Sequence, residues 1–226
     1  CEKRTKLLVE NRISSWFALP PRELKFEFQV DFQNDLFEEM KARIKEDDSS
    51  VPYFYNGYWY ISRYEKGQEY PIHTRKKGSI DAEEEILFDC NEMAEGHEYF
   101  RLVGISISPD NTKAAFAVDT VSRRQYTMKV KDLVSGTYLD TSIENTTGGS
   151  VWAKDNETLF YTQKNPITLR SEAIYRHNIN STSNETTLVY EEKDDTFSVY
   201  VMDSKSEDYI FISSYSTLTT EFQYIK

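Results

Sequence analysis

A unit made of a strand, a polar turn and a strongly apolar strand returns along the chain, and it restricts the fold more than any other feature. Its clearest copies are VGISISPDNTKAAFAVD, GSVWAKDNETLFYTQ and SVYVMDSKSEDYIFISS. The turn residues Asn111 and Asn156 are 45 residues apart, and VPYFYNGYWYISRY supplies an earlier turn at Asn56. A period of about 45–55 residues with about four strands is typical of β-propeller blades. A flat β-sandwich has similar strand spacing without such a unit, so it ranks second.

Short alternating or wholly apolar runs predict the strands of these blades. They lie at 52–56, 58–64, 69–75, 85–89, 102–107, 113–118, 124–131, 136–142, 149–153, 157–163, 172–178, 186–191, 196–202, 207–214 and 219–225. The fold class is therefore all-β, a partial propeller of about three and a half four-stranded blades over residues 51–226. An incomplete ring leaves strand edges unpaired. We therefore expect the chain to be a fragment of a longer protein.

Residues 1–50 form a separate N-terminal segment in this interpretation. Alternation over Leu24–Val30 predicts a strand. After it, apolar residues recur at three- and four-residue spacing and predict one amphipathic helix at about 33–46. These apolar residues are Phe32, Leu36, Phe37, Met40 and Ile44. We expect this apolar stripe to pack on the body of the protein, and a partner-binding helix is the alternative.

Charge and cysteine content narrow the partners and the compartment. The net charge of −11 argues against a nucleic-acid partner, because phosphates would be repelled. Cys1 and Cys90 are the only cysteines and do not make a disulfide framework. No run of 18 apolar residues occurs that could span a membrane. We expect a cytoplasmic protein, with a periplasmic or lipid-anchored form through Cys1 as the alternative.

The sequence lacks the usual catalytic and cofactor-binding motifs. GxSxG, HExxH, the P-loop and GxGxxG are all absent. His73, His97 and His177 are the only histidines, and none has a second ligand at metal-binding spacing on the same face. We therefore expect no metal site and no cofactor, while spacing alone leaves open a Ser-His-Asp set assembled across blades, which no other feature supports.

Three charged segments carry more charge than a hairpin turn needs. They are TVSRRQY at 120–126, YEEKDDTF at 190–197 and EGHEYF around Glu98. The rigid guanidinium fork of Arg suits carboxylates across an interface, and an acidic run suits a cationic partner. Solvated turns remain the simpler interpretation of this composition. The candidate interdomain or substrate-access residues are Glu98, Arg123, Arg124, Glu191, Glu192, Asp194 and Asp195.

The same segments carry a family resemblance. YNGYWYISRYEKGQEYPIHTRKKG, the ISPDN turn with VDTVSRRQY, VWAKDNETLFYTQKNPITL and LVYEEKDDTF follow one another from about Asp31 to the end. In this order they resemble oligopeptidase B (protease II), within the prolyl oligopeptidase family of serine peptidases. The resemblance implies the first part of a seven-bladed propeller that caps a C-terminal α/β-hydrolase domain. That domain, with the catalytic Ser, Asp and His, is absent here.

The resemblance also implies a function. The family cleaves short peptides after Arg or Lys, and its propeller helps to exclude folded proteins from the active site. By this resemblance the chain contacts the hydrolase domain, gates access for short basic peptides and is inactive alone. Two alternatives remain: a stand-alone propeller that binds a peptide or protein, and a structural propeller without a small ligand.

Overall fold

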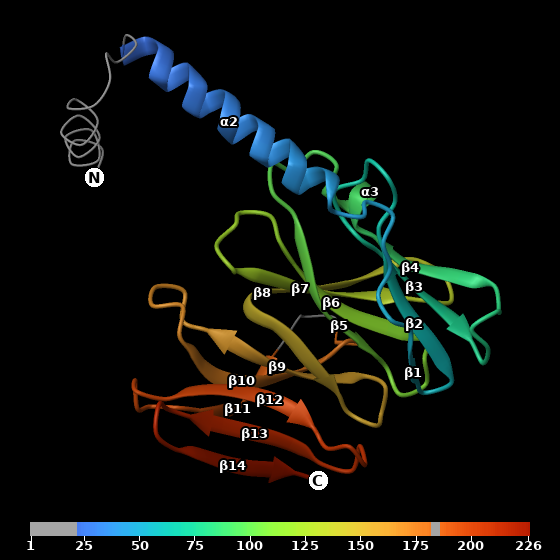
Figure 1. The fold of residues 1–226 in the computed structure, drawn as a ribbon. Helices are drawn as coiled ribbons and strands as arrows, with labels where there is room; N and C mark the ends of the chain where they lie inside the picture. The colour runs from blue at the N-terminus through green and yellow to red at the C-terminus, as the bar shows by residue number, and fades with distance from the viewer. Residues whose placement is uncertain (1–21, 182–185) are drawn as a thin grey trace. The chain divides into compact units, whose positions relative to one another are not determined.

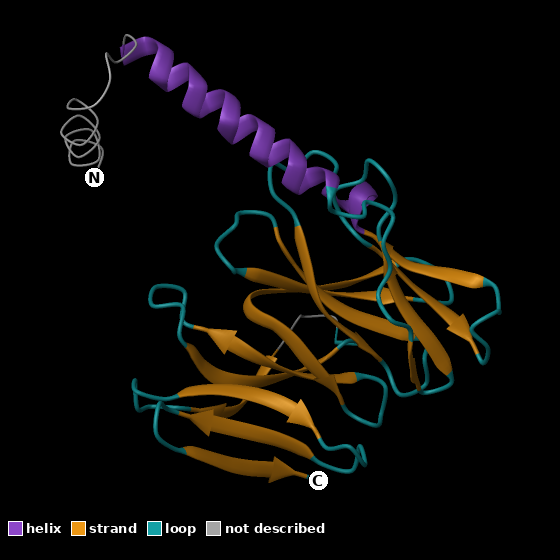
Figure 2. Ribbon diagram, viewed as in Figure 1, coloured by secondary structure: helices purple, strands orange, loops and turns teal. Residues whose placement is uncertain are grey.

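The structure is a computed structural model that describes residues 22–181 and 186–226 (Figures 1 and 2). It divides after Asp48 into two units. The first contains one long helix, and the second, Ser49–Lys226, is built almost wholly of antiparallel strands. Cys1 lies outside the described residues. Among the described helices, none combines the length and apolar character needed to cross a membrane.

The long helix α2 spans Arg22–Ala42. A helix is present as predicted, but the predicted bounds of 33–46 are wrong, and the strand predicted at Leu24–Val30 is also helical. Pro20 and Pro21 stand immediately before the helix, where the fixed φ of proline suits a first turn. The segment 24–30 contains Leu, Lys, Glu and Gln, which are good helix formers. It is therefore helical although its apolar and polar residues alternate as in a strand. Packing of the apolar stripe on the rest of the protein stays a prediction.

The first blade is a four-stranded sheet in the order β1-β2-β3-β4. Its strands are β1 (Tyr53–Tyr55), β2 (Tyr58–Arg63), β3 (Ile72–Lys77) and β4 (Glu84–Asp89). A short helix, α3 (Cys90–Ala94), follows β4, and the Asp89 carboxylate caps it by accepting from the Asn91 and Glu92 N–H groups. The sequence did not predict α3.

The second and third blades share one seven-stranded sheet. Its strands are β5 (Arg101–Ile107), β6 (Lys113–Asp119), β7 (Tyr126–Asp132), β8 (Tyr138–Trp152), β9 (Thr158–Lys164), β10 (Ser171–Asn178) and β11 (Thr186–Glu191). The predicted strands 136–142 and 149–153 are therefore joined in β8. The first half of β8 pairs with β7 and the second half with β9, with a register shift between Thr146 and Ser150. One strand thus ends the second blade and begins the third.

Glycines allow this crossing from one blade to the next. A Cβ on Gly104 would lie 1.8 Å from the Gly148 carbonyl oxygen. Both residues have positive φ, 65° for Gly104 and 97° for Gly148, which favours glycine. The close approach of β5 to β8 therefore requires a residue without a side chain at each position.

The last described blade contains β12 (Ser198–Asp203), β13 (Ile210–Tyr215) and β14 (Thr220–Ile225), in that order. Residues 22–181 and 186–226 thus contain three four-stranded blades and three strands of a fourth, and the partial propeller is confirmed. Figure 1 shows the sheets following one another from the teal first blade to the red last strands.

Three apolar clusters lie between successive blades and hold them together. The first joins Tyr60 and Phe88 to Phe116, and the second joins Met128 of the second blade to Tyr161 of the third. The third joins Ile174, Val199 and Ile212. Blade faces are thus buried against one another, and at ~25 cal/mol per Å² this burial is the main stabilising term.

The turn between the first two strands of each blade has the same backbone geometry. Asn56, Asn111, Asn156 and Glu207 stand in it with φ of 44°, 63°, 58° and 60°. Asn adopts this left-handed region more readily than most residues. This preference explains why Asn marks three of the four turns in the sequence repeat.

Hydrogen bonds join these turns to one another. The Asn56 side-chain amide donates to the Pro109 carbonyl at 2.8 Å, and the Asp110 N–H donates to Asn156 Oδ1 at 2.9 Å. The first-to-second-strand turns of neighbouring blades therefore lie together at one end of the propeller. We call this end the turn end.

Candidate functional site

The opposite end of the propeller carries the loops in which the candidate residues lie. Because the strands of each blade are antiparallel, the connections β4–β5, β6–β7, β9–β10 and β11–β12 leave from that end. They span residues 90–100, 120–125, 165–170 and 192–197. We call this end the loop face. It brings together the three charged segments that the sequence singled out.

A buried aspartate shapes the TVSRRQY loop. Asp119, at the end of β6, is 1% exposed, and its two carboxylate oxygens accept from the N–H groups of Val121 (2.9 Å) and Arg124 (2.6 Å). Ser122 and Arg124 both adopt positive φ, 58° and 54°. The hydrogen bonds to buried Asp119 therefore fix the loop backbone, while the Arg123 and Arg124 side chains are exposed.

Lys164 connects this loop to the third blade. Its ammonium group donates to the Arg124 carbonyl at 2.7 Å and lies 5.7 Å from the centre of the Tyr126 ring. Burial, and then the nearby positive charge of Arg124, lower the pKa of Lys164 below its ordinary value. The loop thus has a fixed position relative to β9.

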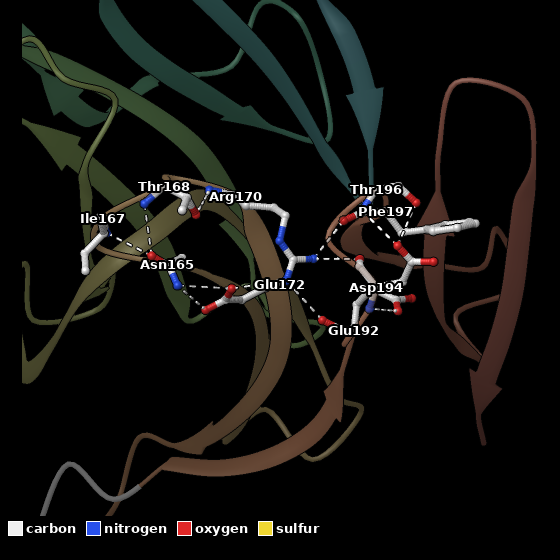
Figure 3. A network of polar contacts seen from close by, with 9 residues as sticks. All are labelled: Asn165, Ile167, Thr168, Arg170, Glu172, Glu192, Asp194, Thr196 and Phe197. Atoms are coloured by element: carbon white, nitrogen blue, oxygen red, sulfur yellow. Dashed lines mark hydrogen bonds and ion pairs between the residues drawn. The ribbon is translucent and has the colours of Figure 1, made fainter.

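Arg170 holds the YEEKDDTF segment in the same way (Figure 3). Its guanidinium group donates to the backbone carbonyls of Glu192 (3.2 Å), Asp194 (3.2 Å) and Phe197 (2.8 Å). It also pairs with the Glu172 carboxylate at 3.3 Å. One partly buried guanidinium group therefore ties the β9–β10 loop to the connection between the third and fourth blades.

Two of the predicted acidic candidates serve this connection itself. The Glu192 carboxylate accepts from the hydroxyls of Ser214 and Tyr190 and from the Asp194 N–H. The Ser214 hydrogen bond is the main cause that lowers the pKa of Glu192. Asp194 accepts from the hydroxyl and N–H of Thr196, which lower its pKa. Both carboxylates therefore have internal partners and structural roles.

The side chains of the other candidates are exposed. They form no hydrogen bond or ion pair with another described residue. They are Glu98, Arg123, Arg124, Glu191 and Asp195. The loop face thus presents both signs of charge on loops that Asp119, Lys164 and Arg170 hold in place.

A cleft of about 720 Å³ runs along β6, β7 and the first half of β8 and reaches two of the charged segments. His97 and Phe100 of the EGHEYF segment form one wall, and Val121 and Gln125 of the TVSRRQY loop form another. Val121 is 57% exposed, so an apolar side chain stands at the cleft rim. The cleft is large enough for a peptide segment or a group of side chains.

Sequence reasoning missed the residues that hold the loops. Asp119 stands before a Ser-containing turn, and this Asx-turn pattern could have indicated its role. Arg170 and Lys164 bind backbone carbonyls of other loops, and no local pattern shows such partners.

The histidines do not form a reactive cluster. His73 Nδ1 lies 2.8 Å from the Ser62 hydroxyl, and burial lowers the pKa of His73. Across residues 22–181 and 186–226, no group of three or more His, Cys, Asp or Glu side chains is placed to hold a metal. Cys90 is a buried free thiol whose pKa burial raises to about 12, so it is an unreactive one.

Comparison with known proteins establishes the family. The family described as "Prolyl oligopeptidase, N-terminal beta-propeller domain" matches residues 25–226. The chain belongs to the prolyl oligopeptidase family. Dipeptidyl aminopeptidase BI of Pseudoxanthomonas mexicana is 37% identical over 84% of this chain, and Protease 2 of Moraxella lacunata is 30% identical over 84%. The chain spans only 28% of the length of each relative.

Solved structures of prolyl oligopeptidase family members have the same fold. Oligopeptidase B from Leishmania major superposes with a TM-score of 0.82 at 28% identity, covering 90% of this chain and 29% of the other. Oligopeptidase B from Trypanosoma brucei gives a TM-score of 0.78 at 28% identity, covering 87% and 28%. The chain thus contains the N-terminal propeller domain of the prolyl oligopeptidase family, which is a family of serine peptidases.

Proposed function

We propose that this chain begins a serine oligopeptidase that hydrolyses short peptides after Arg or Lys. Its loop face contacts the C-terminal hydrolase domain, and the propeller limits access to that domain's active site. Likeness to Protease 2 and to oligopeptidase B supports this activity. The catalytic Ser, Asp and His belong to the hydrolase domain, so the propeller alone breaks no peptide bond.

One observation supports an interface at the loop face: charged side chains without an ion-pair partner lie on segments whose backbone is held in place. Arg123, Arg124, Glu191 and Asp195 are exposed and unpaired with other described residues. The segments that carry them are held by the contacts of Asp119, Lys164 and Arg170, so little conformational entropy is lost when these charges meet a partner. Interfaces between domains are polar and suit such charges.

The chain also enters the propeller at this end. The Ser50 N–H donates to the Ser62 carbonyl at 2.8 Å, and Ser49 bridges to Arg63, where β2 ends. The loop face therefore also carries Ser49 and Ser50, the first residues of this unit.

The activity is tested with an N-blocked, Arg-terminated chromogenic amide. We expect the full-length protein to hydrolyse this amide, a serine-directed inhibitor to abolish the hydrolysis, and the 226-residue chain alone to show none. Turnover by the chain alone that the inhibitor stops would contradict the assignment of catalysis to the hydrolase domain.

A second candidate activity is release of dipeptides from a free N-terminus. The relative named dipeptidyl aminopeptidase BI, 37% identical, favours it. A dipeptidyl amide with a free amino group separates the two activities. Preference for this substrate over the N-blocked Arg amide by more than about tenfold in kcat/KM, about 1.4 kcal/mol, selects the aminopeptidase.

A further inference from the structure

The hairpin between the second and third strands of each blade carries an exposed apolar or aromatic side chain. Because neighbouring strands of a blade are antiparallel, all four of these hairpins leave from the loop face. They span residues 64–71, 120–125, 165–170 and 216–219. The exposed fractions of these side chains range from 45% to 95%, and the residues are Tyr64, Val121, Ile167 and Leu218. The exposed position therefore repeats with the blade, although the hairpins share no sequence motif.

The turn between the first and second strands of each blade lacks this feature. These turns lie at the turn end and span residues 56–57, 108–112, 153–157 and 204–209. Among the described residues, no large apolar side chain is exposed in any of the four. The exposed apolar position thus belongs to the loop-face hairpin of every blade and not to its first turn. Exposed apolar side chains that gather on one face mark an interaction surface.

The hairpin of Ile167 shows that the exposed side chain stands on a fixed backbone. Asn165 Oδ1 accepts from the N–H groups of Ile167 at 2.9 Å and Thr168 at 3.0 Å (Figure 3). The Asn165 side-chain amide donates to the Glu172 carboxylate at 3.1 Å, and this carboxylate also pairs with Arg170. The network therefore holds the backbone of Ile167 in a position that leaves its apolar surface in water within this chain.

Contacts between blades join the hairpins of the second, third and fourth blades. The Lys164 ammonium group at the end of β9 donates to the Arg124 carbonyl of the second-blade hairpin at 2.7 Å. In the third-blade hairpin, Arg170 donates to the Phe197 carbonyl at 2.8 Å, immediately before the fourth blade. The apolar residues thus share one surface with the exposed charges of the loop face. Apolar contacts beside polar and charged ones are typical of protein interfaces.

We propose that Tyr64, Val121, Ile167 and Leu218 form an apolar arc, one residue from each blade, that docks on the C-terminal hydrolase domain. This inference rests on the proposed function, and it adds the contacts that hold the two domains together. The occupant is the remainder of the full-length protein, since the chain spans only 28% of the length of each relative. Burial of apolar surface is not screened by salt, whereas contacts of exposed charges are. The apolar arc therefore keeps the domains in contact at high ionic strength.

The test is thiol labelling of the full-length protein, with one cysteine introduced in each variant. Ile167→Cys and Leu218→Cys probe the apolar arc. Val134→Cys is the matched control, because Val134 is 81% exposed in the β7–β8 hairpin at the turn end and Ile167 is 90% exposed. Mass spectrometry of the labelled peptide gives each rate, which is divided by the rate for the same variant unfolded in urea.

We expect labelling at positions 167 and 218 to be at least about tenfold slower than at position 134. The difference should persist at about 1 M salt. Within this chain the three side chains are all exposed, so only cover by another domain explains slower labelling at two of them. Equal rates at the three positions, or a difference that disappears at high salt, would overturn the proposal.

Arg123→Cys separates this proposal from the proposed function, because Arg123 is an exposed charge of the loop face. Slow labelling at position 123 with fast labelling at 167 and 218 would reject the apolar arc and leave the contact with the hydrolase domain intact. Fast labelling at all three positions would reject the loop-face contact and the apolar arc together. Hydrolysis of the Arg-terminated amide tests the activity independently of either result.

A second set of variants tests whether the apolar arc holds the contact or only lies within it. Ile167→Ser combined with Leu218→Ser should make labelling of Arg123→Cys at least about threefold faster, because less apolar surface is buried when the domains meet. Val134→Ser removes an exposed apolar side chain at the turn end and should leave that rate unchanged. An equal effect of the two sets of serine variants would contradict the role of the apolar arc.

Discussion

The charged residues at the loop face fall into two groups that differ in what their side chains contact. Asp119, Lys164 and Arg170 are turned inward and bind backbone groups of the loops. Arg123 and Arg124 are exposed. The inward group sets loop geometry, and the outward group is available to a partner. Substitutions in the two groups should therefore affect different measurements.

The first prediction concerns Asp119. Replacing it with Ala removes the acceptor for the N–H groups of Val121 and Arg124, so the loop loses its fixed geometry. We expect the free energy of unfolding to fall by about 1–3 kcal/mol, and amide hydrogen exchange to become faster only in residues 120–126. Mass-spectrometric exchange on the full-length protein measures it. Asp119→Asn keeps one acceptor oxygen and should show a smaller change; an unchanged exchange rate in the Ala variant would refute the role.

At the scale of elements, a carboxylate stabilises the turn between the first and second strands of the second and third blades. Asp155 accepts from the N–H groups of Glu157 (2.9 Å) and Thr158 (2.8 Å) and from the Thr158 hydroxyl (2.7 Å). Burial raises the pKa of Asp155, but these hydrogen bonds outweigh burial and lower the pKa below its ordinary value of 3.8. The ionised form therefore stabilises the folded turn.

This shift predicts an acid-sensitive turn. A depressed folded-state pKa contributes stability above the unfolded pKa, near 4, and this contribution is lost as pH falls through the folded value. Asp155→Asn should lower the propeller's thermal midpoint at neutral pH and reduce its decline below about pH 4. Calorimetric scans between about pH 6 and pH 3 would show this. Parallel pH curves for the variant and the unmutated protein would contradict it.

The crossing between the second and third blades gives a second prediction for an element. Gly104→Ala would place a Cβ 1.8 Å from the Gly148 carbonyl oxygen at a φ of 65°. The backbone must move to avoid this overlap. We therefore expect the free energy of unfolding to fall by about 3 kcal/mol or more, which a lower urea midpoint of unfolding would show. Gly149→Ala is the matched control, because no atom lies within 4 Å of its added Cβ. Equal midpoints for the two variants would disprove the steric requirement.

The elements also show how far the sequence could lead. Blades were predictable because a left-handed turn favours Asn, and Asn56, Asn111 and Asn156 mark the repeat. The continuity of β8 could not be predicted, because the sequence Thr-Thr-Gly-Gly at 146–149 is typical of a break between strands. The start of α2 was misread because seven alternating residues fit both a strand and a helix. Arg170 was missed because its partners are carbonyl oxygens, which carry no residue identity.

The unit Ser49–Lys226 has two structurally different ends. The turn end is joined by hydrogen bonds between blades, such as that of Asn56 to the Pro109 carbonyl. The loop face carries exposed charges and a cleft of about 720 Å³. A rigid turn end and a charged loop face suit a lid that docks on another domain.

The last prediction tests this polarity in the full-length protein. Arg124→Ala removes an exposed guanidinium at the loop face, while its backbone N–H can still bind Asp119. Arg and Ala are both L-residues, so the positive φ of 54° costs about the same in each. We expect kcat/KM for short peptides to fall several-fold at low salt, about 1 kcal/mol, without a change in the propeller's thermal midpoint.

Salt and a matched variant decide whether the loss arises at an interface. An exposed ion pair is screened at high ionic strength, so the difference between Arg124→Ala and the unmutated protein should shrink toward 1 M salt, where the Debye length is about 3 Å. Lys205→Ala removes an exposed cation from the β12–β13 turn at the turn end and should leave kcat/KM unchanged. Because both variants alter net charge equally, only contact at the loop face explains a difference between them. Equal kinetics for all three proteins at every salt concentration would eliminate the interface role of Arg124.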